Sequence, residues 1–185
     1  MTTKTKERPI LLTAAMVRAI LDGQKTQTRR IAKEFCGLQG MDKLLAQFPN
    51  QEGCRYGKPG DRLWVRETWG LTVEDTVCYR ADEPSSIVTR WRPSIFMPRW
   101  GSRILLEITA VRVERLQSIS EADARAEGIA DGGCLNCGES EPCGCGDPQP
   151  DARDAFAWLW QSIHGSESWH VNPPVWVVEF RRVQP

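Results

Sequence analysis

The sequence Gly23-Gln24-Lys25-Thr26-Gln27-Thr28-Arg29-Arg30 lies between a short amphipathic segment and a predicted strand. Its last six residues include one lysine, two threonines and two arginines. So many polar side chains at a helix-to-strand junction indicate a functional site more than a hydrophobic core. Side chains alternate along a regular strand, so Lys25 and Thr28 would face opposite ways within one. If both serve one pocket, we expect Lys25 to lie in the turn after Gly23, before regular strand pairing begins.

The residues before this stretch predict a strand followed by a helix. The apolar run at residues 9–12 favours a strand, and Thr13 can cap the next helix by accepting a hydrogen bond from a free backbone N–H group. Apolar residues recur at helical spacing over residues 17–21. Gly23 suits the left-handed backbone conformation that commonly ends a helix.

The remaining chain predicts an α+β fold. The clearest strand pattern spans residues 103–116, where Ile104, Leu106 and Ile108 share one face. Strands and helices do not alternate as βαβ units, which favours a small, mostly antiparallel β-barrel with a few short helices. The further strands are expected at residues 25–31, 62–69, 77–81 and 175–180, and the further helices at residues 120–128 and 154–164.

The chain length of 185 residues suits one domain. We expect a flexible tail at residues 1–8 and a single domain at residues 9–185. Two segments are expected to elaborate that domain. Residues 32–56 have weak periodicity and predict a variable loop, with one helical turn around residues 41–48. Residues 130–150 form an insert rich in glycine, cysteine and proline.

Composition excludes some classes of protein. Lysine plus arginine and aspartate plus glutamate number 24 each, so bulk charge gives no case for nucleic-acid binding and any such case must be local. No apolar run approaches the roughly 18 residues of a membrane span, and the polar start of the chain does not resemble a secretory signal. We therefore expect a cytoplasmic protein with reduced thiols and no membrane partner. No obligate protein partner is evident from the sequence.

The cysteines of the insert have the spacing of a metal site. Cys134-x-x-Cys137 is followed by Cys143-x-Cys145, and glycines follow the second and third cysteines. Four thiolates in this arrangement can surround a tetrahedral zinc ion and leave no open coordination position. We expect a structural zinc and no cofactor for catalysis. The alternative is an exposed loop whose cysteines are incidental.

An arginine–tryptophan stretch spans residues 90–103 and contains no aspartate or glutamate. Cations beside flat aromatic rings suit contact with phosphates and stacking on bases. The alternative is that the tryptophans are core residues and the arginines form a solvated rim. The arginines and tryptophans of the stretch are Arg90, Trp91, Arg92, Arg99, Trp100 and Arg103.

Lys25 and Thr28 could act together in catalysis. A threonine hydroxyl is a poor nucleophile without a neighbouring base, and a lysine whose pKa is lowered by burial or by nearby arginines can serve as that base. A carboxylate is also needed to carry the proton to the leaving group. Glu67 and Glu127 are the candidates, although by spacing alone each could be a surface carboxylate.

Three segments together resemble the ASCH superfamily, a branch of the PUA-like β-barrels. They are residues 23–30, residues 120–129 and the closing run at residues 176–180. The resemblance implies a PUA-like (ASCH) fold with the cysteine-rich insert added to it. The chain also resembles uncharacterised ASCH-domain proteins of phages and prophages, which share the runs at residues 62–69 and 91–94.

Within that superfamily, small bacterial N4-acetylcytidine amidohydrolases use a lysine, a threonine and a glutamate. Their Gly-x-Lys-Thr-x-Thr-x-Arg motif is matched here with Lys25 and Thr28 in place, and their glutamate corresponds to Glu127. The resemblance therefore implies a catalytic set of Lys25, Thr28 and Glu127. The substrate-binding candidates are Thr26, Arg30, Arg66, Glu67, Trp69, Trp91, Arg92 and Arg99.

Two functions follow as hypotheses. The first is an amidohydrolase that acts on an N-acylated nucleoside or nucleotide base related to N4-acetylcytidine. The second is a binding module for RNA or modified DNA, or a ribonuclease, that uses the same cleft and the arginine–tryptophan stretch. A third, less specific reading is a phage accessory protein with a vestigial cleft.

Overall fold

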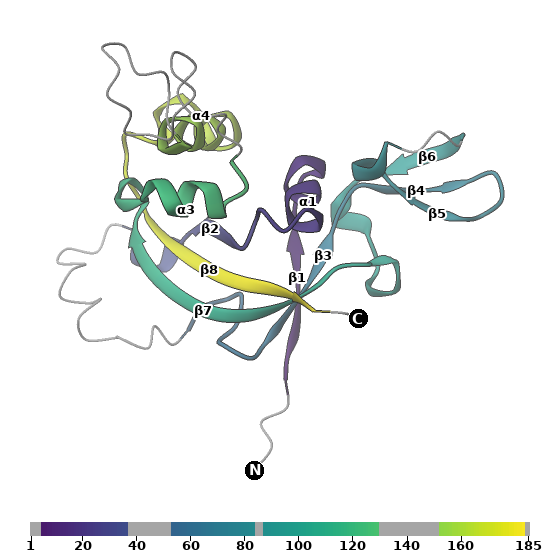
Figure 1. The fold of residues 1–185 in the computed structure, drawn as a ribbon, viewed down its shortest axis with the longest axis horizontal. Helices are drawn as coiled ribbons and strands as arrows, with labels where there is room; N and C mark the ends of the chain where they lie inside the picture. The colour runs from purple at the N-terminus through teal and green to yellow at the C-terminus, as the bar shows by residue number, and fades with distance from the viewer. Residues whose placement is uncertain (1–4, 37–52, 84–86, 130–151, 184–185) are drawn as a thin grey trace. The chain divides into compact units, whose positions relative to one another are not determined.

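The computed structural model describes residues 5–36, 53–83, 87–129 and 152–183 (Figure 1). The chain divides into two compact units. The first unit comprises Met1–Gly23, Glu52–Val111 and Val178–Pro185, and the second comprises Gln24–Gln51 and Arg112–Val177. The predicted helical turn at residues 41–48 and the cysteines of the insert lie outside the described residues.

The larger sheet has five strands. In spatial order they are β1 (Glu7–Leu11), β3 (Arg62–Arg66), β7 (Leu105–Arg115), β8 (Pro174–Val183) and β2 (Gln27–Ile31). β1 pairs with β3 in parallel, and β3 pairs with β7 in the antiparallel direction. Among the described residues this order is open, because it begins at β1 and ends at β2. The α+β class is confirmed, whereas the closed barrel is not.

A second sheet of three strands lies in the first unit. Its order is β5 (Val77–Tyr79), β4 (Trp69–Thr72) and β6 (Val88–Arg92), and both pairings are antiparallel (Figure 1). One sequence prediction is wrong here, and one strand was missed. Residues 62–69 do not form one strand, since β3 ends at Arg66 and β4 begins at Trp69. β6 was not predicted, because it carries no apolar alternation and its burial is low throughout.

Local capping signals place the helices as expected. Thr13 accepts a hydrogen bond from the backbone N–H of Met16 at the start of α1 (Ala14–Leu21), and Gly23 follows with a φ of 76°. Ser120 and Asp123 form a complete capping box at the start of α3 (Glu121–Ala126). The remaining α-helix among the described residues is α4 (Ala152–His164). The described 3₁₀ turns are Lys33–Phe35, Arg80–Asp82, Ser94–Phe96, Arg99–Gly101, Leu116–Ser118 and Ser166–Ser168.

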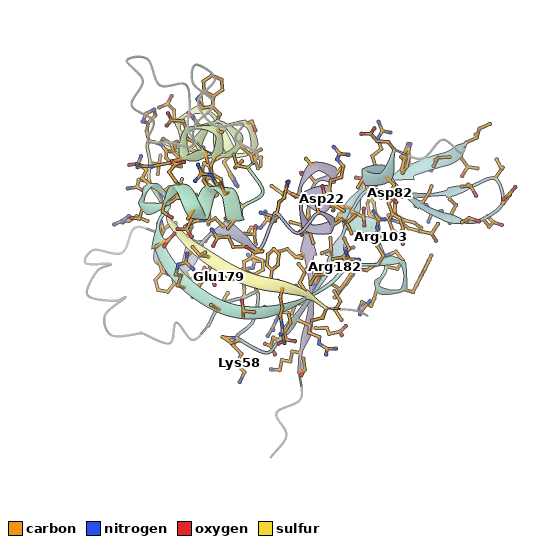
Figure 2. The ribbon with its side chains drawn as sticks, in the orientation of Figure 1. Asp22, Lys58, Asp82, Arg103, Glu179 and Arg182 are labelled. Atoms are coloured by element: carbon orange, nitrogen blue, oxygen red, sulfur yellow. The ribbon has the colours of Figure 1, made fainter. Side chains whose placement is uncertain are left out.

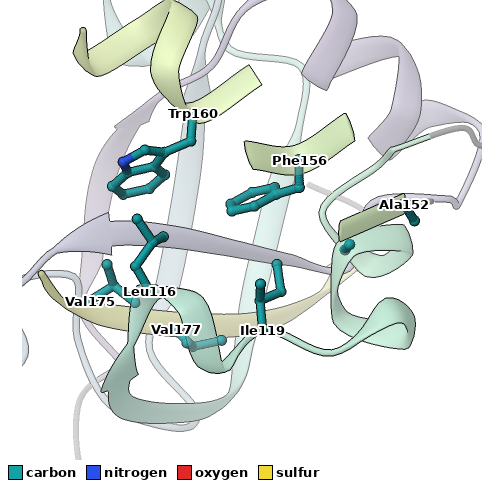
Figure 3. Close-up of a cluster of buried hydrophobic side chains, with 8 residues drawn as sticks. Leu116, Ile119, Ala152, Phe156, Trp160, Val175 and Val177 are labelled. Carbon is teal, nitrogen blue, oxygen red and sulfur yellow. The ribbon is translucent and has the colours of Figure 1, made fainter. Parts of the chain in front are cut away.

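Each unit buries its own apolar side chains. In the first unit β3 alternates, with Leu63 and Val65 buried between half-buried neighbours. In the second unit Phe156 and Trp160 of α4 pack over apolar residues of β8 and of the segment before α3 (Figure 3). Ile163, near the end of α4, does not share this burial and is 48% exposed. No helix in the described part of the chain is long and apolar enough to cross a membrane.

Candidate active site

Lys25 lies before the start of β2, but the expectation that it lies in the turn after Gly23 is wrong. Its backbone forms an isolated antiparallel bridge with Glu127, and the N–H of Thr26 donates to the carbonyl of Ala126 at 2.8 Å. These contacts attach the residues before β2 to the end of α3. The two segments are far apart in the sequence, so the tertiary structure brings them together.

Glu127 is positioned by the way in which α3 ends. It is the C-terminal cap of the helix, and Gly128 follows with a φ of 87°. The last carbonyl groups of a helix lack partners within the helix. The Nζ of Lys25 donates to the backbone carbonyl of Glu127 at 2.7 Å and therefore satisfies one of these groups.

The same lysine makes a buried ion pair with the Glu127 side chain. Nζ of Lys25 donates to Oε2 of Glu127 at 2.8 Å, and the exposed fractions of the two side chains are 0% and 4%. Burial lowers the pKa of Lys25 below its usual range, although the Glu127 charge and hydrogen bond oppose this shift. The positive charges of Arg30 and Arg29 lower it further. The site therefore contains a lysine that gives up its proton more readily than usual.

Arg29 is the second cation on this carboxylate, and the sequence analysis missed it. Its Nη1 donates to Oε1 of Glu127 at 3.2 Å, and its Nη2 bonds Glu114 and lies 3.3 Å from Oδ2 of Asp123. The guanidinium group is fully buried and lies 5.9 Å from the ring centre of Phe156. Its Nε has no hydrogen-bond partner among the described residues. Both oxygens of Glu127 are thus occupied by cations.

Strand alternation could have indicated Arg29. Lys25, Gln27 and Arg29 are two residues apart, and all three contact α3 or its last turn. The Nε2 of Gln27 donates to the carbonyl of Asp123 at 2.9 Å. The period of two therefore continues from Lys25 into β2 and selects Arg29. The family motif instead points to Arg30.

By the same alternation, Thr28 lies on the opposite face of the strand from Lys25, Gln27 and Arg29. The residue is 2% exposed, so its hydroxyl is not on the open surface. Among the described residues no hydrogen bond joins this hydroxyl to Lys25 or Glu127. Of the three predicted catalytic residues, the structure thus brings Lys25 and Glu127 into contact and leaves Thr28 buried without such a bond.

Two other motif residues lie nearby in the chain. Thr26 is exposed, and Arg30 is half-buried. The positive charge of Arg30 acts on Lys25, and together with burial, which is the larger cause, it lowers the pKa of His164.

The other substrate-binding candidates belong to the first unit, where several are already engaged. Glu67 receives two hydrogen bonds from Arg103, at 3.0 and 3.1 Å. Arg66 donates to the carbonyl of Ile95, and Arg99 donates to Glu7 at 3.0 Å. These three residues are therefore held by internal contacts.

The tryptophans among the candidates differ in burial. Trp69 is buried, and the guanidinium of Arg92 lies 5.0 Å from its ring centre. Trp91 is half-buried, and the guanidinium of Arg80 lies 5.2 Å from its ring centre. Trp91 and Arg92 therefore remain accessible from solvent, whereas Trp69 is buried beneath the Arg92 guanidinium.

The zinc prediction concerns residues outside the described part of the chain. These residues are Cys134, Cys137, Cys143 and Cys145. Within residues 5–36, 53–83, 87–129 and 152–183, no group of three or more histidine, cysteine, aspartate or glutamate side chains could hold a metal ion.

No family model and no curated protein matches the sequence. Two solved structures are similar to the chain. The ASCH domain from Lactobacillus crispatus JV V101 has 14% sequence identity and a TM-score of 0.46, and the match covers 97% of this chain and 81% of that chain. A protein from Enterococcus faecalis V583 with the family model DUF984 has 12% identity and a TM-score of 0.41, and the match covers 90% of this chain.

The chain spans 66% of the length of the Enterococcus protein. At these identities and TM-scores, the two similarities carry no information about substrate or site residues. The solved structures similar to this chain include an ASCH domain, and ASCH is the superfamily that the sequence motifs of this chain resemble.

Proposed function

We propose that the protein is an amidohydrolase that removes an acyl group from the exocyclic nitrogen of a nucleoside or nucleotide base, as in N4-acetylcytidine. The buried contact between Lys25 and Glu127, with the lowered pKa of Lys25, is the observation that supports this proposal most directly. A base and a carboxylate that share a hydrogen bond can pass a proton between them.

The hydrogen bonds of Lys25 suit the role of a base. A neutral amine has two N–H donors and one lone pair. Both donors have acceptors, the backbone carbonyl and Oε2 of Glu127. Neutral Lys25 can therefore keep both of these hydrogen bonds while its lone pair accepts a proton from a nucleophile.

In the proposed reaction, Thr28 Oγ1 attacks the acyl carbon and its proton moves to Nζ of Lys25. The proton then passes through Glu127 to the leaving nitrogen as the carbon–nitrogen bond breaks. A water molecule hydrolyses the resulting ester, releases the carboxylic acid and restores the Thr28 hydroxyl. Because this hydroxyl makes no hydrogen bond to Lys25 in the described residues, substrate binding must bring the two groups together.

The test is turnover of N4-acetylcytidine and of related acylated nucleosides and nucleotides, monitored by chromatography. We expect Lys25→Ala, Thr28→Ala and Glu127→Gln each to reduce the rate by about 10²-fold or more. Gln24→Ala is the matched control, since Gln24 is an exposed neighbour in the same stretch. Absence of turnover by the wild type over this panel, or full activity in both Lys25→Ala and Glu127→Gln, contradicts the proposal.

A second candidate function is binding of RNA or modified DNA. The accessible Trp91 and Arg92 favour it, because exposed arginines and aromatic rings suit phosphates and bases. Cleavage of labelled RNA would separate a ribonuclease from a pure binding module.

We also propose a structural zinc ion held by Cys134, Cys137, Cys143 and Cys145, on the basis of their spacing in the sequence. Metal analysis of protein purified without added metal should give about one zinc per chain. Cys137→Ser should lower that ratio. Protein without zinc ends this proposal and leaves the hydrolase proposal unaffected.

A further inference from the structure

The three-stranded sheet of the first unit presents arginines and aromatic rings that the hydrolase proposal does not use. β6 is at one edge of this sheet, and Pro93 follows it directly. A pocket of about 280 Å³ lies at this edge, lined by Arg90, Trp91, Arg92, Pro93 and Phe96. We call these five residues the β6 surface.

The backbone beneath this surface is tightly packed. Trp91 is opposite Gly70 in the register of β4 and β6. A methyl group at Gly70 would lie 2.6 Å from Cγ1 of Val88 and 2.9 Å from the carbonyl oxygen of Arg90. The glycine therefore allows β6 to lie close against β4 and fixes the strand that carries the tryptophan.

Both aromatic side chains of the β6 surface can be reached by a ligand. Phe96 is 69% exposed, and Trp91 is half-buried with a guanidinium group over its ring. Large aromatic side chains are usually buried, so an exposed one beside a pocket indicates a binding surface. Trp100, which is also 69% exposed, extends the apolar character of this region.

The arginines of the β6 surface are available for an anion. In the described part of the chain, neither Arg90 nor Arg92 forms an ion pair with a carboxylate. Arg103 in the same unit differs, because Glu67 and Asp82 occupy its guanidinium with four hydrogen bonds; Figure 2 shows Arg103 beside Asp82. The pocket thus combines two unpaired cations, two aromatic rings and no acidic side chain.

We propose that the β6 surface binds single-stranded nucleic acid, with one base in the pocket against Trp91 or Phe96 and backbone phosphates on Arg90 and Arg92. Arginines suit phosphates, and aromatic faces stack on bases of any sequence. The pocket is slightly smaller than the roughly 300 Å³ at which drug-sized ligand sites begin, which suits one unstacked base. A duplex has its bases stacked and cannot place one there without flipping it. The inference rests on the second candidate function, nucleic-acid binding, and does not depend on the hydrolase proposal.

Fluorescence anisotropy with the full chain and labelled oligonucleotides tests this inference. We would use unmodified RNA and DNA strands of about 12 nucleotides, within the ~4–16 that small binding modules cover, and vary salt between about 50 and 200 mM. We expect both single strands to bind more tightly than a duplex of the same length. The unmodified strands carry no acyl group, so their binding is measured without turnover and is separate from failure of the hydrolase.

Three variants locate the binding. Arg90→Gln/Arg92→Gln should weaken binding about tenfold or more and reduce the slope of log K against log salt by roughly 1.4, at about 0.7 per lost phosphate contact. Phe96→Ala should weaken binding by about tenfold with the slope unchanged, because stacking carries no charge. The matched control Lys33→Gln/Lys58→Gln removes two exposed positive charges elsewhere and should change the affinity less than about twofold.

Four results would overturn the inference. The first two are no binding of single strands at the lower salt concentration, and equal weakening of binding by the arginine variant and the lysine control. The other two are tighter binding of the duplex than of single strands, and displacement of the labelled strand by poly-glutamate as effectively as by unlabelled single strand. The last result would indicate a general polyanion or acidic-peptide site. Circular dichroism of each variant confirms that its fold is intact, and Phe96 and the arginines are exposed enough for that to be expected.

Discussion

Each compact unit holds a buried glutamate, but different cations hold the two carboxylates. Glu67 receives two hydrogen bonds from the guanidinium of Arg103, at 3.0 and 3.1 Å. Glu127 receives one from Nζ of Lys25 at 2.8 Å and one from Nη1 of Arg29 at 3.2 Å. Arginine remains protonated in proteins, whereas a buried lysine can lose its proton. The cation of the Glu67 network therefore cannot give up a proton, whereas Lys25 in the Glu127 network can.

Burial acts on the titrating groups of the two networks in a way that fits this difference. It raises the pKa of Glu67, against the opposing effect of Arg103. In the other unit it lowers the pKa of Lys25. Both shifts disfavour a buried charge, but the second prepares a base.

The largest effect is expected from Lys25→Arg. This variant replaces the lysine on Glu127 with a guanidinium group, the kind of cation that Arg103 provides to Glu67. The charge remains, but arginine cannot accept the proton of a nucleophile. Turnover of the acylated nucleoside should fall by about 10²- to 10⁴-fold. Chemical denaturation should show that the free energy of unfolding falls by about 1–3 kcal/mol, because the larger side chain must fit a packed site. Retained turnover would show that Lys25 is not the base.

Arg103→Ala removes the structural network of the first unit. It leaves the Glu67 carboxylate buried without its partner and should lower the free energy of unfolding by about 3–5 kcal/mol. Asp82→Asn is the control, since the Asp82 side chain is 44% exposed, and it should cost less than about 1 kcal/mol. Urea denaturation measures both variants. A cost for Arg103→Ala no greater than that of Asp82→Asn would contradict the role assigned to this arginine.

Arg29→Gln removes the guanidinium group that binds Glu127, the same kind of cation that holds Glu67 in the other network. Losing its hydrogen bonds to charged groups should cost about 2–3 kcal/mol of stability. The loss is smaller than for Arg103→Ala because Glu127 keeps Lys25, and Glu114 and Asp123 are exposed enough to be hydrated. Urea denaturation measures this cost. Arg29→Lys should recover part of it, and equal stability of the two variants would show that the charge is unimportant.

The smallest effect is a dependence of stability on pH. The pKa of Lys25 is lower in the folded protein than its unfolded value near 10.4. Between the two values the unfolded chain binds more protons, so the free energy of unfolding rises with pH. Relative to Lys25→Met, the wild type should gain about 1.4 kcal/mol per unit of pKa lowering as the pH rises through this window, and lose it as the pH falls through the folded pKa. Parallel curves for the two proteins would exclude a lowered pKa.

Local sequence determined most of the secondary structure. The Thr13 cap, the capping box at Ser120 and the alternation of β3 each depend on residues close together in the chain, and the structure has all three. β6 could not be found in this way, because an edge strand carrying exposed arginines and a tryptophan over a glycine has no apolar period.

The tertiary structure decided the order of the strands and the contacts of the site. The sequence named Lys25 and Glu127 through a motif, but the two residues are separated by 102 positions, and packing alone brings Nζ to within 2.8 Å of Oε2. The motif indicates Arg30 and not Arg29, since a motif carries no information about which face of β2 meets α3. Capping and alternation depend on neighbouring residues, whereas the pairing of charges depends on how separate elements pack.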